Sequence, residues 1–205
     1  MVSKEHYFSQ EPAGQRKLKQ VSFVVGGREV TAKASSGTFS SSGLDKGTKV
    51  LLSLSSDFPQ SGDVLDLGCG WGPIALSIAT LSPSANLWAI DVNTRSVELT
   101  RQNSEALGLK NLTAVLADEL PDNLRFQEIW SNPPIRIGKS ELHALLERYL
   151  SRLLPGGRAM LVVQKQLGAE SLMKWLSEQF VGHQVKKFHT DKGYWVIEVI
   201  RPTDQ

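Results

Sequence analysis

The sequence has little of several features that mark particular classes of protein. Its 205 residues include one cysteine, Cys69, which excludes an internal disulfide and a cysteine cluster for a metal. The formal net charge is only +2, far from the basic surplus of a strong nonspecific nucleic-acid binder. No apolar run approaches the length of a membrane span, and residues 1–12 lack the apolar core of a signal peptide. We therefore expect a cytoplasmic protein with no metal and no membrane partner.

From residue 63 onward the sequence alternates short apolar runs with helix-like segments. DVLDLG (63–68) and NLWAID (86–91) are apolar on both faces, which is typical of parallel strands covered by helices on each side. The last two runs, HQVKKFH and GYWVIEVI, flank a short turn, TDKG, and predict an antiparallel hairpin. The pattern therefore predicts an α/β fold with a doubly wound, mostly parallel seven-stranded sheet and an antiparallel C-terminal hairpin.

The residues before this region have a different character. VSFVVGGREVTAKAS (21–35) contains two β-prone runs around Gly26-Gly27, a two-residue hairpin signal. A Gly/Ser-rich loop follows, and a short apolar helix is expected from Thr48, with Thr48 as its N-cap. We expect residues 1–58 to form a small N-terminal extension with a β-hairpin, a lid loop and a short helix, and residues 59–205 to form the main domain.

A glycine-rich turn follows the first strand of the predicted sheet. VLDLGCGWGP (64–73) places Asp66, Gly68, Gly70 and Gly72 there, at the edge where open α/β sheets bind ligands. Glycines allow a ligand to approach the backbone closely. A dinucleotide fingerprint needs G-x-G-x-x-G, and Pro73 stands where its third glycine would be.

Two further aspartates end the next two predicted strands. Asp91 closes WAID and could accept from both hydroxyls of a ribose, and Asp118 closes LAD and could accept from an adenine amino group. Either aspartate alone is more often a strand-end cap or a solvated charge. Together with Asp66 and the glycine turn they predict a nucleoside-shaped pocket with no site for a pyrophosphate.

The run VLDLGCGWGPIALSIA, followed by AIDVN, LAD and SNPP, resembles the class I S-adenosylmethionine-dependent methyltransferases. More narrowly, the chain is similar to their small methyltransferase domain, the branch that contains ribosomal RNA guanine-N2 methyltransferases. HYFSQEP (6–12), GTFSSSGLDKGTKVLL (37–52), NPPIRIGK (132–139) and VVQKQLGA (162–169) are also similar to stretches of its stand-alone members. The resemblance covers nearly the whole chain and implies a Rossmann-like fold.

The resemblance also implies roles for individual residues. The methionine part of S-adenosylmethionine would lie against the turn, with Asp66 positioning its amino group. Asp91 would hold the ribose, Asp118 the adenine, and Asn132 would lie beside the transferable methyl. The lid loop would close over the cofactor. The cofactor-binding residues expected on this basis are Asp45, Gly47, Thr48, Asp66, Gly68, Gly70, Gly72, Asp91 and Asp118.

Asn132, Pro133 and Pro134 form a stiff corner at the end of a predicted strand. An exocyclic amine on a base is a poor nucleophile because its lone pair is delocalised into the ring. The Asn132 side-chain oxygen and the Pro133 carbonyl could accept both amino hydrogens, and two prolines restrict the backbone so that the acceptors are already in place. We therefore expect these three residues to be the catalytic corner, which needs no general base that ionises.

The corner departs from many related enzymes at the next residue. They place Tyr or Phe there to stack on the base, whereas this sequence has Ile135. We expect Ile135 to pack on the substrate and Phe39 to share the stacking. Arg136 and Lys139 could contact phosphates or could simply be solvated charges, and Lys165, between Gln164 and Gln166, could contact substrate.

The expected reaction is methyl transfer from S-adenosylmethionine to an exocyclic amine, and the resemblance suggests guanine N2 of 16S-type ribosomal RNA. The partner would then be ribosomal RNA or a ribosomal subunit, with the protein a monomer or homodimer. A protein glutamine or a small molecule remains an alternative substrate. A cofactor-binding module without catalysis and a nicotinamide dehydrogenase are further alternatives, disfavoured by the intact corner and by Pro73 respectively.

Overall fold

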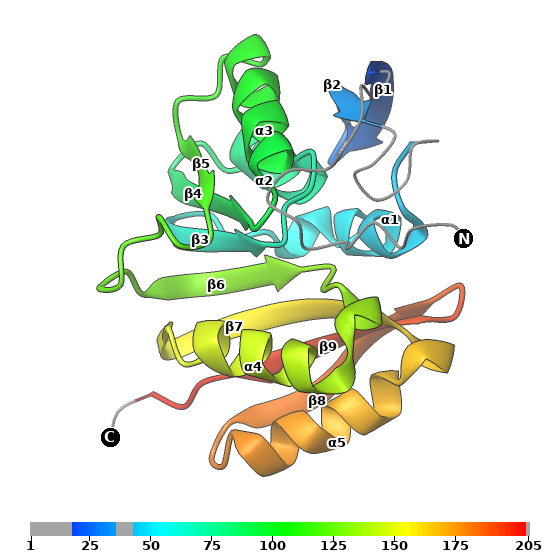
Figure 1. The fold of residues 1–205 in the computed structure, drawn as a ribbon, viewed down its shortest axis with the longest axis vertical. Coiled ribbons are helices and arrows are strands. Elements are labelled where there is room, and N and C mark those ends of the chain that lie inside the picture. The colour runs from blue at the N-terminus through cyan, green and yellow to red at the C-terminus, as the bar shows by residue number, and fades with distance from the viewer. Residues whose placement is uncertain (1–17, 36–42, 204–205) are drawn as a thin grey trace, which may run out of the picture.

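The centre of the protein is a seven-stranded sheet in the order β5-β4-β3-β6-β7-β9-β8 (Figure 1). The computed structural model describes residues 18–35 and 43–203. Five neighbouring strands are parallel, β9 is antiparallel to β7, and β8 is antiparallel to β9. The strands are β3 (Gly62–Leu67), β4 (Ala85–Asp91), β5 (Leu112–Leu116), β6 (Phe126–Ser131), β7 (Leu153–Gln164), β8 (Gln184–Asp191) and β9 (Tyr194–Ile200). The predicted α/β fold class is confirmed.

Helices cover both faces of this sheet, as the apolar runs require. They are α1 (Lys46–Leu52), α2 (Pro73–Leu81), α3 (Thr94–Ala106), α4 (Lys139–Leu150) and α5 (Ala169–Gln179), with short 3₁₀ turns η1 (Ser55–Asp57), η2 (Ile135–Ile137) and η3 (Lys165–Leu167). In Figure 1, α4 and α5 lie over the face turned to the viewer. Along β7, Met160 and Val162 belong to one buried cluster, and Leu161 and Val163 to the other. This double burial explains why the strand is continuously apolar.

The N-terminal hairpin consists of β1 (Leu18–Val25) and β2 (Arg28–Ser35), as predicted. Gly26 and Gly27 have φ of 52° and 77°, and a two-residue hairpin turn of this kind requires positive φ at both positions. Val25 and Val30 are buried in the same cluster as Trp130 of the main sheet. The hairpin therefore packs into the core that lies beneath the glycine turn.

Asn103 of α3 attaches this hairpin to the glycine turn. Its Oδ1 accepts from the Lys33 amide at 2.8 Å, while its Nδ2 donates to the carbonyls of Lys33 at 2.9 Å and of Trp71 at 3.0 Å. The side chain is only 2% exposed, so each of these bonds satisfies a polar group that water does not reach. Phe23 of β1 also packs edge-on against Trp71.

Two predicted boundaries are wrong. The N-cap of α1 is Asp45, not Thr48, because the Asp45 carboxylate accepts from the amides of Gly47 and Thr48 and leaves Thr48 inside the first turn. Strand β5 ends at Leu116, so Asp118 lies two residues beyond it rather than at its end.

In the ranges that the structure describes, no helix is long and apolar enough to cross a membrane. The same residues contain no group of three or more His, Cys, Asp or Glu side chains that could hold a metal ion.

Candidate active site

The candidate site lies where the order of the parallel strands reverses. Chain order runs outward from β3 through β4 to β5 on one side, and from β6 to β7 on the other. Open α/β sheets bind ligands at the carboxyl ends of the strands at such a point. The hydroxyl of Ser131, at the end of β6, donates to the carbonyl of Leu67, at the end of β3, at 2.7 Å. This bond joins the residue before Asn132 to the residue before Gly68.

The glycine turn leaves an open surface at two of its positions. Gly68 and Gly70 have φ of 77° and 58°, and a Cβ built on either would meet nothing within 4 Å. The amides of Gly68 and Cys69 both donate to the Ile90 carbonyl at 2.9 Å, which fixes the turn against β4. The backbone at these two positions is therefore rigid and accessible to a ligand.

At Gly72, glycine is needed for helix packing and not for access of a ligand. It caps α2 with φ of 91°, and a Cβ there would lie 2.8 Å from Cγ2 of Thr100 in α3. Because residue 72 has no side chain, α2 and α3 can pack closely. The expected contact of Gly72 with the cofactor stays a prediction.

Asp66 is completely buried below the turn. Its Oδ2 accepts from the Ala75 amide at 2.9 Å, whereas Oδ1 has no hydrogen-bond partner among the described residues. Burial raises the pKa of this carboxyl, the Ala75 hydrogen bond lowers it and the charge of Asp91 raises it, and the net result is a pKa of about 7. A buried acceptor without a donor is costly, so Oδ1 is suited to a cationic donor.

Asp91 ends β4 and connects the glycine turn to the next helix. Its Oδ2 accepts from the Gly70 amide at 3.0 Å and its Oδ1 from the Asn93 amide at 2.9 Å. Burial raises the pKa of this carboxyl as well. Each oxygen keeps a lone pair beyond its backbone bond, so the expected bonds to ribose hydroxyls are possible. Asp118, by contrast, is exposed.

Asn132 is held by the start of α1. Its Nδ2 donates to Asp45 Oδ2 at 2.7 Å and to Thr48 Oγ1 at 3.2 Å. An ionised carboxylate can only accept, so Asp45 selects the orientation in which the amide nitrogen faces α1. The Asn132 Oδ1 is then the atom left for a ligand.

The prolines after Asn132 fix a second carbonyl. Pro134 has φ of −74° and ψ of 77°, and the Ile135 amide donates to the Pro133 carbonyl at 2.8 Å. These values define an inverse γ-turn. The Pro133 oxygen keeps one lone pair for another donor.

Gly47 stands between these groups. A Cβ at this position would lie 3.1 Å from Asp45 Oδ2, 3.2 Å from Asn132 Oδ1 and 3.2 Å from Cε1 of Tyr194. Glycine therefore lets α1 approach the corner. Asp45, Gly47 and Thr48 are brought against Asn132, and their expected contacts with the cofactor stay predictions.

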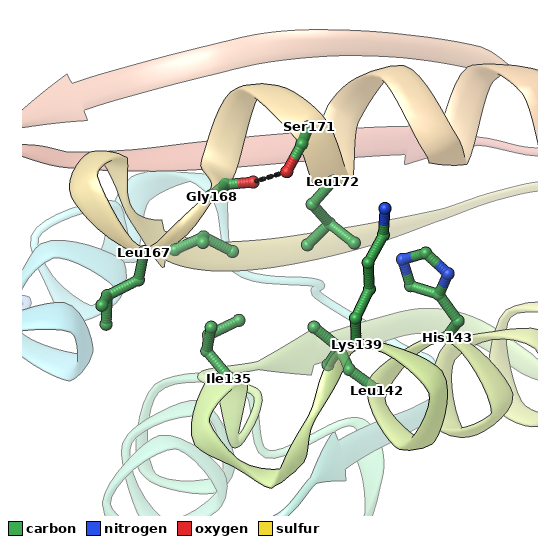
Figure 2. Close-up of a pocket in the computed structure, with 9 residues that line it drawn as sticks. Ile135, Lys139, Leu142, His143, Leu167, Gly168, Ser171 and Leu172 are labelled. Carbon is green, nitrogen blue, oxygen red and sulfur yellow. Dashed lines mark hydrogen bonds between the residues drawn. The ribbon is translucent and has the colours of Figure 1, made fainter.

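A cavity of about 150 Å³ lies beyond the corner, between the N-terminal ends of α4 and α5. Figure 2 shows Ile135, Leu142 and Leu172 directed into it, with Lys139 and His143 at one side. Ile135 thus directly follows the corner and forms part of the cavity wall. Of the other predicted substrate residues, Arg136, Lys139 and Lys165 are exposed, and Phe39 lies outside the described residues.

Tyr194 also lies at this site, and the sequence did not predict it. This residue begins β9 and pairs with Gln164 at the end of β7, which brings its ring to Gly47 and the corner. The only signal for Tyr194 in the sequence is its place next to the turn of the C-terminal hairpin. An aromatic residue in a strand is ordinarily part of the core, so this signal does not indicate a functional site.

The strand order, the glycine turn and the aspartates at the strand ends define a class I methyltransferase. The family model described as "Methyltransferase small domain" matches residues 29–198. The chain therefore belongs to the methyltransferase small domain family, and it is an S-adenosylmethionine-dependent methyltransferase.

The chain is similar to several individual proteins. The uncharacterized protein YbxB of Bacillus subtilis is 34% identical over 95% of this chain and 97% of its own length. Ribosomal RNA small subunit methyltransferase C of Yersinia pestis is 34% identical over 80% of this chain, which spans only 47% of that relative. Among solved structures, the T. thermophilus 16S rRNA N2 methyltransferase RsmC, in complex with AdoMet and guanosine, has a TM-score of 0.77 and 27% identity. That similarity covers 93% of this chain and 52% of the other.

Proposed function

We propose that this enzyme methylates the exocyclic N2 amine of a guanine in ribosomal RNA of the 16S type. The observation that carries the proposal is the orientation of Asn132, whose amide nitrogen is held by Asp45 at 2.7 Å. This contact leaves Asn132 Oδ1 free to accept. Together with the Pro133 carbonyl, it gives two acceptors at the strand ends beside the glycine turn. A planar amino group is the substrate group that two such acceptors suit.

The residues of the turn fit the cofactor. Asp66 Oδ1 is a buried acceptor without a partner, which suits the ammonium group of a methionine. The open faces of Gly68 and Gly70 suit close approach of the cofactor's chain, and Asp91 would hold the ribose. When bound, S-adenosylmethionine supplies a methyl group on a positively charged sulfur. We place Asp118 near the adenine, since the turn that follows β5 lies next to Asp91 in the sheet.

The chain's own residues would then act on the amine. Asn132 Oδ1 and the Pro133 carbonyl accept its two hydrogens, which favours a pyramidal nitrogen and directs the lone pair away from the ring. Both acceptors are fixed in advance, Asn132 by α1 and Pro133 by the γ-turn, so little reorganisation is needed. Good alignment of reactants can lower a barrier by up to about 7–11 kcal/mol. The methylated nitrogen then gives its extra proton to water, so no side chain has to ionise.

Ribosomal RNA is proposed from the named relatives, which are ribosomal RNA small subunit methyltransferases. The chain spans about half the length of these proteins, so their substrate is a proposal for this one. Arg136, Lys139 and Lys165 are exposed around the corner, where they could contact phosphates. The net charge of only +2 favours an assembled small subunit as the substrate, since the particle supplies further contacts. This role places the protein in the cytoplasm.

Tritium transfer to separate fractions tests the proposal. Purified enzyme and labelled cofactor are incubated with unmodified small ribosomal subunits, free 16S RNA and the ribosomal protein fraction. The expected product is N2-methylguanosine, found by mass spectrometry at one position of the subunit RNA. Label in the protein fraction as methylglutamine, or in no fraction, would contradict the proposed substrate.

A further inference from the structure

The residue after the two prolines of the corner is aliphatic, Ile135. The structure brings an aromatic ring to the corner from another element. Tyr194 Cε1 and Asn132 Oδ1 both lie 3.2 Å from the position that a Gly47 Cβ would occupy. The edge of the ring and the oxygen that is left for the substrate amine therefore border the same space above Gly47.

The position of Tyr194 is determined by the sheet. It is the first residue of β9, and its register partner is Gln164, the last residue of β7. The Lys165 amide donates to the Gly193 carbonyl at 2.8 Å, which secures the chain just before the tyrosine. Side chains alternate along a strand, so Tyr194 shares the face of buried Val196, the face on which α1 packs.

Tyr194 could contact a ligand as well as pack against the core. Its side chain is half-buried and packs against the edge of the core cluster, so part of it remains accessible. Burial raises the pKa of its hydroxyl, and the nearby Asp45 charge raises it further. The phenol therefore stays neutral at physiological pH, and the accessible part of a neutral ring can stack on a base.

We propose that Tyr194 is the specificity-determining aromatic residue that stacks on the acceptor base beside Asn132. The proposal rests on the proposed function. It assigns to Tyr194, near the C-terminal end of the sequence, the stacking role that the sequence predicted for Phe39. Ile135 then supplies an aliphatic contact on the other side of the corner, toward the cavity of Figure 2.

Kinetics of matched variants test this assignment. Tyr194→Leu keeps an apolar side chain but removes the ring, and Tyr194→Phe keeps the ring. Stacking of a base on an aromatic side chain is worth about 1–3 kcal/mol, so the leucine variant should lose about fivefold to 150-fold in kcat/KM for the small subunit. The phenylalanine variant should restore most of the loss, and cofactor affinity should be unchanged in both. Phe188→Leu, in the middle of β8, is the control for a lost aromatic residue on the same sheet.

A fluorescent substrate provides the direct readout. A small ribosomal subunit reconstituted with 2-aminopurine at the methylated position carries the same exocyclic amine, and the emission of this base is quenched when it stacks. Wild type and Tyr194→Phe should quench it, while Tyr194→Leu should not, at saturating protein. Quenching and kcat/KM that are equal in wild type and Tyr194→Leu would overturn the assignment while leaving the proposed function intact. A wild-type enzyme that methylates no RNA fraction would overturn the function, and this assignment with it.

Discussion

The side chains of Asp45 and Asn132 are 87 residues apart in the sequence and 2.7 Å apart in the structure. Asp45 Oδ2 also accepts from the amides of Gly47 and Thr48. One carboxylate oxygen therefore caps α1 and orients the amide of Asn132. The stability of α1 and the direction of Asn132 Oδ1 depend on the same group.

Replacing Asp45 separates these two roles. In Asp45→Ser the hydroxyl can still cap α1 but is too short to hold Asn132, so we expect near-normal stability and a loss in kcat of about tenfold to a hundredfold. Asp45→Ala loses the cap as well and should melt earlier, with an additional cost of about 1 kcal/mol. Thermal unfolding and single-turnover rates of both variants measure the two effects. A serine variant with wild-type kcat would show that Asp45 is only a helix cap.

Gly47 should be intolerant of even one methyl group. Alanine ordinarily favours a helix over glycine by about 1 kcal/mol, but here its Cβ would press on Asp45, Asn132 and Tyr194 at 3.1–3.2 Å. We expect Gly47→Ala to lower kcat several-fold with little gain in stability. Lys46→Ala, at an exposed position of the same turn, is the control. Full activity in Gly47→Ala would mean that the corner has room to adjust.

Asp66 should make cofactor binding depend on pH. Its pKa is raised from 3.8 to about 7, and a cation against Oδ1 would favour the ionised form. The affinity for S-adenosylmethionine should therefore fall as pH drops below about 7, by up to about tenfold per unit, with release of protons on binding. Asp66→Asn should bind weakly and without this dependence. Calorimetry in buffers of different ionisation enthalpy measures both quantities, and a constant affinity from about pH 5.5 to about pH 7.5 would exclude this role.

The same shift predicts the stability of the cofactor-free protein. The folded state binds a proton at Asp66 more readily than the unfolded state, so this group's contribution is fully present below the unfolded pKa of 3.8 and is lost as pH rises to about 7. Over that window the free energy of unfolding should fall by up to about 1.4 kcal/mol per pH unit from this group. Denaturation of wild type and Asp66→Asn at several pH values isolates the contribution. Parallel curves for the two proteins would contradict it.

Asn103 should couple the hairpin to the glycine turn. Asn103→Ala leaves the amide and carbonyl of Lys33 and the carbonyl of Trp71 without their partner, at about 1–3 kcal/mol for each group that water cannot reach. We expect faster amide exchange in β2 and weaker cofactor binding. Ser96→Ala, a buried residue of the same helix, is the control. Unchanged exchange in β2 would show that the hairpin is held by its apolar contacts alone.

The glycine turn and the parallel strands could be predicted because their signals are local. Strands buried on both faces are continuously apolar, and Gly68 and Gly70 adopt positive φ that other residues rarely accept. The contact of Asp45 with Asn132 could not be predicted, because it depends on how α1 packs against the sheet. The N-cap was misplaced for a related reason, since Asp45 and Thr48 are both good caps and only the tertiary contact favours Asp45. Tyr194 was missed because its role depends on the register of β9 with β7.

The most direct test of the account is single-turnover methyl transfer by Asn132→Ala, with cofactor affinity measured on the same protein. We predict that the rate falls about a hundredfold or more while the dissociation constant for S-adenosylmethionine changes little, because the role proposed for Asn132 is on the amine and not on the cofactor. Asn86→Ala, an exposed asparagine on β4, should behave as wild type. An Asn132→Ala enzyme that transfers the methyl group at the wild-type rate would contradict the account.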